Sequence, residues 1–197
     1  MLVLPTAYFG DVYYYFQITN AERICIETQE HFIKQSIRST TNILTANGVQ
    51  KLTVPVLNKS EKKPIKELRI SYREPWQRVH WQAIKSAYGN APYFVHYEPY
   101  IMALYEKKYE FLFDLNEEIR KVLFKLLKLN TEISYSEEYN SELIPYLYRS
   151  KKSEKPEVNF RSYTQVFSDR FPFQNNLSIL DLLFNCGPKG LDKDLAV

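Results

Sequence analysis

Glycine is scarce in this chain, where it accounts for only 5 of 197 residues. The glycine-rich loops of dinucleotide-binding and P-loop proteins are absent, as are the Gly-x-Ser-x-Gly turn of serine hydrolases and the His-Glu-x-x-His motif of zinc proteases. Any catalytic site therefore has to be built from side chains that are scattered along the sequence.

Cysteine is also rare, and its two copies, Cys25 and Cys186, lie in apolar runs. Neither belongs to a Cys-x-x-Cys pair or to a Cys/His ligand spacing, so both are expected to be reduced, buried small hydrophobes. The sequence predicts no metal site.

A strong charge of one sign is missing as well. The 26 basic and 23 acidic residues leave a net charge of +3, which is too balanced to indicate a nucleic-acid surface. No apolar run approaches the length of a membrane span, and residues 1–5 lack the basic region of a signal peptide. We expect a cytoplasmic protein without nucleic-acid partners or a membrane span.

What the chain has in abundance is aromatic residues: 16 Tyr, 12 Phe and 2 Trp. Such a content is more typical of an aromatic core with a polar rim than of a sugar-stacking site. With 45% apolar residues, the chain can bury one good core, so a single domain over residues 1–197 is expected. Residues 149–161 are polar and predict a connector to the C-terminal element.

The order of apolar runs predicts an α/β fold. Residues 1–5 and 23–27 are expected strands, and the aromatic segment 9–20 between them is an expected helix. Residues 65–70 alternate partly and predict another strand. The firmest local expectation is a β-hairpin around Asn47-Gly48, a dipeptide that accepts positive φ at both centres of a type I′ turn.

Helical periodicity follows in three places. From Pro75 to Gly89, Val79 and His80 fall on one predicted apolar face, together with Trp76, Ala83, Ile84 and Ala87. Residues 114–117 form a possible capping box for a helix that ends near Asn130. In the C-terminal element, Ser178 is an expected N-cap with Asp181 as its reciprocal group, and Gly187-Pro188 ends the helix.

The predicted hairpin carries a candidate anion-binding face. With Asn47-Gly48 as the turn, Asn42 lies opposite Thr53, and Leu44 opposite Lys51; Arg38 points the same way if the strand extends that far. Arg38 would offer a planar fork to phosphate or carboxylate and Lys51 a point charge. The simpler alternative is a solvated sheet face.

His80 and Glu27 are candidates for acid or base chemistry. His80 lies on the apolar stripe beside Trp81, where burial could tune its proton affinity, although a lone histidine there is more often a satisfied core residue. Glu27 ends an apolar strand, where α/β sheets present residues to a ligand crevice; it could equally be a surface carboxylate.

The order of several motifs resembles the WbqC-like family of bacterial proteins, which is associated with surface-polysaccharide and O-antigen gene clusters. The resemblance runs through nearly the whole chain. Its blocks are residues 7–9 with 15–16, residues 32–35 with Arg38, residues 43–48 with 52–56, the aromatic region at 76, 80–81, 87–88 and 92–94, and the ending at 163–167 with 175–188. Two departures are Leu4 in place of Gln and Ser39-Thr40 in place of Asn-Arg, the second of which removes a cation.

The resemblance implies an enzyme of surface-polysaccharide biosynthesis, a possible transferase that moves an aminoacyl or acyl group to an amino sugar. Arg38, Asn42, Lys51 and Tyr8 would then bind a sugar nucleotide or another phosphorylated small molecule, and His80, Lys34 and Glu27 would be the catalytic candidates. No cofactor is indicated. The alternative is a non-catalytic binding or assembly protein that holds a ligand or enzymes of the same pathway.

Overall fold

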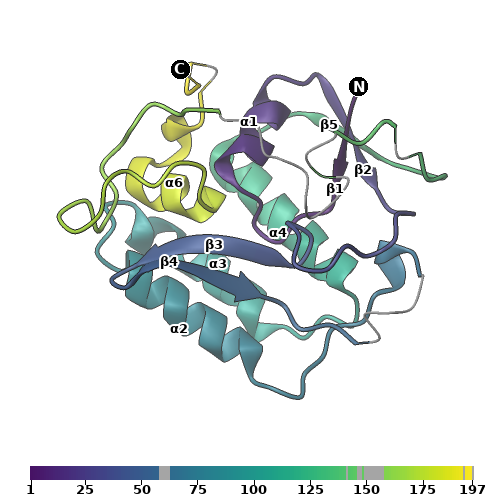
Figure 1. Ribbon diagram of the computed structural model, residues 1–197, viewed down its shortest axis with the longest axis horizontal. Coiled ribbons are helices and arrows are strands. Elements are labelled where there is room, and N and C mark those ends of the chain that lie inside the picture. Colours follow the sequence, from purple (N-terminus) through teal and green to yellow (C-terminus); the bar gives the residue numbers. More distant parts are fainter. Residues whose placement is uncertain (58–62, 141, 146–147, 149–157, 193, 197) are drawn as a thin grey trace.

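The computed structural model describes residues 1–57, 63–140, 142–145, 148, 158–192 and 194–196. Most of the predicted polar connector at 149–161 lies outside the described residues. The fold is mixed α/β, as expected from the order of apolar runs (Figure 1).

A parallel sheet is formed by β1 (Leu2–Pro5), β2 (Arg23–Glu27) and β5 (Glu132–Tyr135), in the order β1-β2-β5. Helix α1 (Val12–Thr19) connects β1 to β2, which confirms the predicted strand-helix-strand start. The Asp11 side chain caps this helix by accepting a hydrogen bond from its first turn. The carboxyl ends of all three strands therefore meet at one edge of the sheet.

The predicted hairpin is confirmed, but its turn differs. Strands β3 (Thr40–Thr45) and β4 (Gly48–Thr53) pair so that Thr45 lies opposite Gly48 and Asn42 opposite Lys51. Gly48 has a φ of 98°, whereas Asn47 is not in the left-handed region. The turn is therefore centred one residue earlier in the sequence than the predicted type I′ turn at Asn47-Gly48. The glycine follows the turn and takes the left-handed position of a bulge.

The pairing register therefore shifts by two residues from the predicted one. Because side chains alternate with a period of two, this shift keeps Asn42, Lys51 and Thr53 on the predicted face. Leu52 and Ile43 face the core on the other side and are fully buried.

Three helices form much of the body. Helix α2 (Trp76–Tyr88) confirms the period read from residue 75 onward, and α3 (Phe94–Glu106) and α4 (Leu112–Leu127) follow it. Helix α2 packs against α3 and β3, and α3 packs against α4. In Figure 1 the hairpin crosses the molecule between α2 and the C-terminal helix α6 (Ile179–Cys186). A short 3₁₀ turn, η2 (Pro188–Gly190), follows α6.

Some local predictions are wrong. Residues 65–70 contain a 3₁₀ turn, η1 (Ile65–Glu67), and pair with other segments only through single bridges from Arg69 and Ile70. Helix α4 starts at Leu112, so Asp114 lies inside its first turn and does not cap it. Val79 is 51% exposed because it turns away from the buried side of α2.

The C-terminal helix is capped by Ser178 as predicted, through a hydrogen bond from the Leu180 N–H. Asp181 does not complete a capping box. Its carboxylate is fully buried and accepts hydrogen bonds from the Tyr163 hydroxyl at 2.7 Å and the Gln165 amide at 2.8 Å. Tyr163 and Gln165 thereby tie segment 163–167 to α6.

Candidate functional site

A chain of three buried side chains joins segments that are far apart in the sequence. The Tyr8 hydroxyl lies 2.8 Å from Nδ1 of His80 and 2.7 Å from the Tyr105 hydroxyl. Tyr8 follows β1, His80 is in the second turn of α2, and Tyr105 is near the end of α3. We call Tyr105, Tyr8 and His80 the relay.

Local backbone geometry directs Tyr8 into the relay. The two following residues, Phe9 and Gly10, both have positive φ values, which reverses the chain between β1 and α1. A Cβ atom on Gly10 would approach Cε2 of Tyr15 to 2.9 Å, so this position requires glycine on steric as well as conformational grounds. The Tyr8 N–H donates to the Ile37 carbonyl at 2.9 Å, which holds the backbone in place.

The relay is uncharged at neutral pH. Burial lowers the pKa of His80 to about 4, because the protein interior disfavours the imidazolium. Burial raises the pKa of Tyr8 and of Tyr105, so both phenols keep their protons. With neutral partners, two hydrogen arrangements are consistent: Tyr105 to Tyr8 to His80, or the reverse from an Nδ1–H tautomer. The relay can therefore move a proton in either direction.

One end of the relay reaches an open pocket. Tyr105 lines a pocket of about 630 Å³ between the start of α2 and the end of α3. Such a volume is typical of small-molecule sites. The other lining residues are Tyr72, Arg73, Glu74, Pro75, Gln77, Arg78, Trp81, Met102, Glu106 and Lys108.

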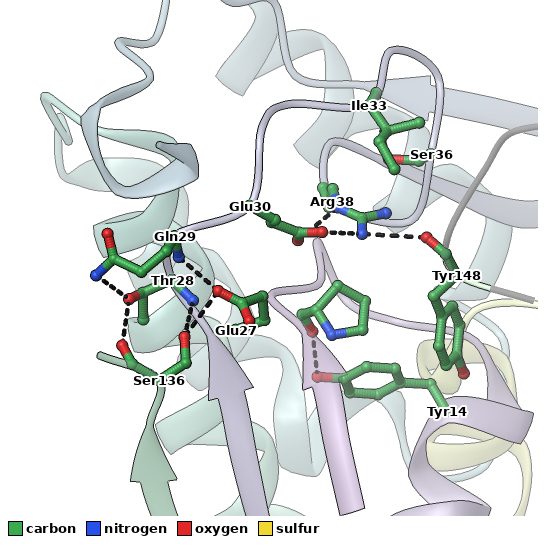
Figure 2. A network of polar contacts seen from close by, with 11 residues as sticks. Tyr14, Glu27, Thr28, Gln29, Glu30, Ile33, Ser36, Arg38, Ser136 and Tyr148 are labelled. Atoms are coloured by element: carbon green, nitrogen blue, oxygen red, sulfur yellow. Dashed lines mark hydrogen bonds and ion pairs between the residues drawn. The ribbon is translucent and has the colours of Figure 1, made fainter. Parts of the chain in front are cut away.

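A second buried polar cluster lies beyond the carboxyl ends of the parallel strands (Figure 2). Glu27, at the end of β2, accepts hydrogen bonds at Oε1 from the Gln29 N–H at 2.6 Å and from the Ser136 hydroxyl at 2.7 Å. Arg38 forms a two-pronged ion pair with Glu30 and also donates to the Tyr148 carbonyl at 3.1 Å. We call Glu27, Glu30 and Arg38 the charged cluster.

The charged cluster corrects the prediction for Arg38. This side chain is only 1% exposed, and its guanidinium donates hydrogen bonds to Glu30 and to the Tyr148 carbonyl. It therefore does not share the outer face of the hairpin with Lys51. Burial is the main cause that raises the pKa of Glu30, and the neighbouring Arg38 opposes it. The arginine is therefore already occupied by the protein itself.

The seven predicted site residues fall into three pairs and one separate residue. Tyr8 and His80 meet in the relay, and Glu27 and Arg38 meet in the charged cluster. Asn42 and Lys51 lie opposite each other on the hairpin, while Lys34 is exposed in the loop after β2. The structure thus does not bring all seven into one site.

Other features of the site were not found from the sequence. Tyr105, Glu30 and the pocket residues Arg73, Arg78 and Lys108 carry no motif, and their proximity depends on packing between helices. Pro99 lies inside α3 and weakens the sequence pattern that would predict a helix there, so the position of Tyr105 on that helix is not evident from the sequence. Among the described residues, no group of three or more His, Cys, Asp or Glu side chains could hold a metal ion.

No helix in the described part of the chain is long and apolar enough to cross a bilayer. The model of the WbqC-like protein family matches residues 6–145, and the chain therefore belongs to that family. It is 25% identical to the uncharacterized protein Rv1507c of Mycobacterium tuberculosis over 91% of this chain and 90% of that protein. No solved structure matches it significantly.

Proposed function

We propose that this member of the WbqC-like family is a cytoplasmic enzyme of bacterial surface-polysaccharide biosynthesis, of the O-antigen type, which transfers an aminoacyl or acyl group to the amine of an amino sugar. The observation that carries the proposal is the relay, which connects an open pocket at Tyr105 to a buried neutral imidazole at His80. Acylation of an amine releases a proton, and a neutral hydrogen-bonded relay can accept it.

In the proposed reaction the sugar amine attacks the carbonyl carbon of an activated donor, such as a thioester or ester, so that a C–N bond forms. The bond from that carbon to sulfur or oxygen breaks, and the leaving group takes the electron pair. The proton from the amine passes to the oxygen of Tyr105, while the Tyr105 proton moves to Tyr8 and the Tyr8 proton to Nδ1 of His80. Because burial disfavours the imidazolium, the relay then returns a proton to the leaving sulfur or oxygen, and His80 is neutral again.

In this scheme Tyr105 is the catalytic residue, because it lines the pocket and would touch the substrate. Tyr8 and His80 act through it. His80 is only 5% exposed and pairs with Tyr8, so it has no direct role in binding. Its neutral state at physiological pH follows from the burial that lowers its pKa.

The test is an assay of transfer from labelled acyl-CoA and aminoacyl donors to nucleotide-activated amino sugars, with products identified by mass. Tyr105→Phe removes one hydroxyl and is expected to lower kcat about 100-fold, a typical contribution of acid–base catalysis. Tyr100→Phe is the matched control, because Tyr100 is on the same helix, is 43% exposed and lies outside the pocket. Equal turnover in both variants contradicts the proposed role of the relay.

A second candidate function is a non-catalytic assembly role in the same pathway. Its support is the exposed apolar surface on and just before α3, where Tyr93, Val95 and Tyr100 are 38%, 68% and 43% exposed. A stable complex with pathway enzymes that is insensitive to His80→Gln, together with no transfer from any donor, would favour this role.

A further inference from the structure

We propose that the pocket beside Tyr105 binds a nucleoside diphosphate, with the diphosphate at the start of α2 and the base against its aromatic wall. This inference deepens the proposed function by naming the nucleotide part of its substrate. It rests on the proposed function only for the identity of the sugar that the nucleotide would carry.

The first support is a set of three basic side chains in the pocket, which outnumber its two carboxylates. Arg73, Arg78 and Lys108 line it, and none of the three forms an ion pair with a described residue. Elsewhere in the described chain, Arg23, Arg69 and several other exposed cations do pair with carboxylates. Arginine forks suit phosphate oxygens, which they can bind in a bidentate manner.

The second support is the backbone at the same place. No side chain caps α2, and its first turn contains no acidic residue. Among the described residues, the N–H groups of Gln77 and Arg78 donate no hydrogen bond. Gln77 and Arg78 line the pocket together with Arg73, so these free donors, the positive end of the helix dipole and two arginines all belong to the lining of one pocket.

The third support is the aromatic wall. Trp81 and Tyr72 are both half-buried and line the pocket together with Met102. Trp81 is held in place by stacking on Phe94, with ring centroids 6.3 Å apart and planes 16° apart. A fixed indole beside cationic groups provides the apolar surface that a nucleobase requires.

The fourth support is the position of the relay. Tyr105 lines the same pocket as the two arginines, so a ligand anchored by its phosphates at the start of α2 can extend to the Tyr105 hydroxyl. Glu74 and Glu106 also line the pocket and make it less cationic overall. They would repel a free polyanion but can accept hydrogen bonds from the hydroxyl groups of a ribose or sugar.

The experiment measures binding of UDP, dTDP and GDP to the full chain by calorimetry, with inorganic pyrophosphate and uridine as part-ligands. At least one diphosphate is expected to bind, and Arg73→Ala and Arg78→Ala are each expected to weaken its Kd at least tenfold. Both arginines are exposed, so these variants should fold normally. Arg170→Ala is the matched control, since this exposed arginine lies outside the pocket.

Several results would overturn the inference. The first is that none of the three diphosphates binds. The second is that Arg170→Ala weakens the affinity as much as the pocket variants do. The third is that Lys51→Ala weakens the affinity while Arg78→Ala does not, which would place the anion on the hairpin. The outcomes for the proposed function are separate. Diphosphate binding through Arg73 and Arg78 without any transfer leaves this inference standing, whereas transfer to a free amino sugar without nucleotide binding contradicts this inference alone.

Discussion

The relay and the charged cluster are two buried polar networks at the same end of the fold, and they differ in charge and in access. The relay is built from neutral groups, and Tyr105 opens it to a pocket. The charged cluster contains one cation and two carboxyl groups, and its hydrogen bonds go to the protein's own backbone and to Ser136. Its charges are paired within the protein, whereas the relay ends at Tyr105, which lines the pocket.

This difference explains why Arg38, the arginine that looked most suitable for anion binding, does not lie on the outer face of the hairpin. A buried guanidinium is costly unless it is paired, so Arg38 is satisfied by Glu30 within the fold. Arg73 and Arg78 are exposed, have no such partner among the described residues and can exchange water for a ligand. Burial alone is therefore a poor guide to a binding residue.

The largest effect is expected from breaking the charged cluster. Arg38→Met keeps the approximate length of the side chain but leaves Glu30 buried without its partner, and should lower the free energy of unfolding by about 3–5 kcal/mol in urea titrations. Arg23→Met is the control, since its exposed pair with Glu132 is worth about 0–1 kcal/mol. The double change Arg38→Met and Glu30→Leu should recover much of the loss; no recovery would show that packing, not the charge pair, dominates.

The next effect comes from the pH dependence of the relay. Since the pKa of His80 is about 4 in the folded state and about 6.5 in the unfolded chain, the unfolded state binds more protons between these values. His80 therefore lowers the stability by about 3 kcal/mol as the pH falls from 7 to 4. The difference in the free energy of unfolding between the wild type and His80→Gln, measured at several pH values, isolates the contribution of His80. His96→Gln, at an exposed site, should retain the full dependence.

Removing single hydroxyls from the relay should have smaller, graded effects. Tyr8 takes part in two hydrogen bonds and Tyr105 in one, so Tyr8→Phe should cost about 2 kcal/mol and Tyr105→Phe about 1 kcal/mol in thermal or urea unfolding. If Tyr105→Phe lowered the stability more than Tyr8→Phe, Tyr8 would not be the central residue of the relay.

The smallest effect is expected on the hairpin face. Lys51 is exposed on β4 and has Asn42 opposite it, so Lys51→Ala should change the free energy of unfolding by less than about 0.5 kcal/mol. The measurement is urea unfolding. A larger loss of stability would show that the outer face of the hairpin packs against other parts of the protein.

Several parts of the fold could be predicted from residues close together in the sequence. The strands at both ends of α1, the hairpin with its correct outward face, helix α2 and the Ser178 cap all follow from local patterns. Two wrong predictions come from local patterns that the fold overrides: Asp114 and Asp181 match capping patterns, but the first lies inside a helix and the second accepts hydrogen bonds from Tyr163 and Gln165. A capping motif states only what a side chain can do, and tertiary partners decide what it does.

The candidate site shows the same division. Local sequence patterns are enough to place His80 on the apolar side of a helix and Glu27 at the end of a strand, and to show that no common nucleotide or hydrolase motif is present. The contacts of Tyr8 with His80 and Tyr105, and of Arg38 with Glu30, depend on the tertiary fold. The reason is physical: local periodicity sets which face of an element is buried, whereas the partner of a buried polar group is chosen by packing between segments that are 97 positions apart for Tyr8 and Tyr105 and 110 for Arg38 and Tyr148.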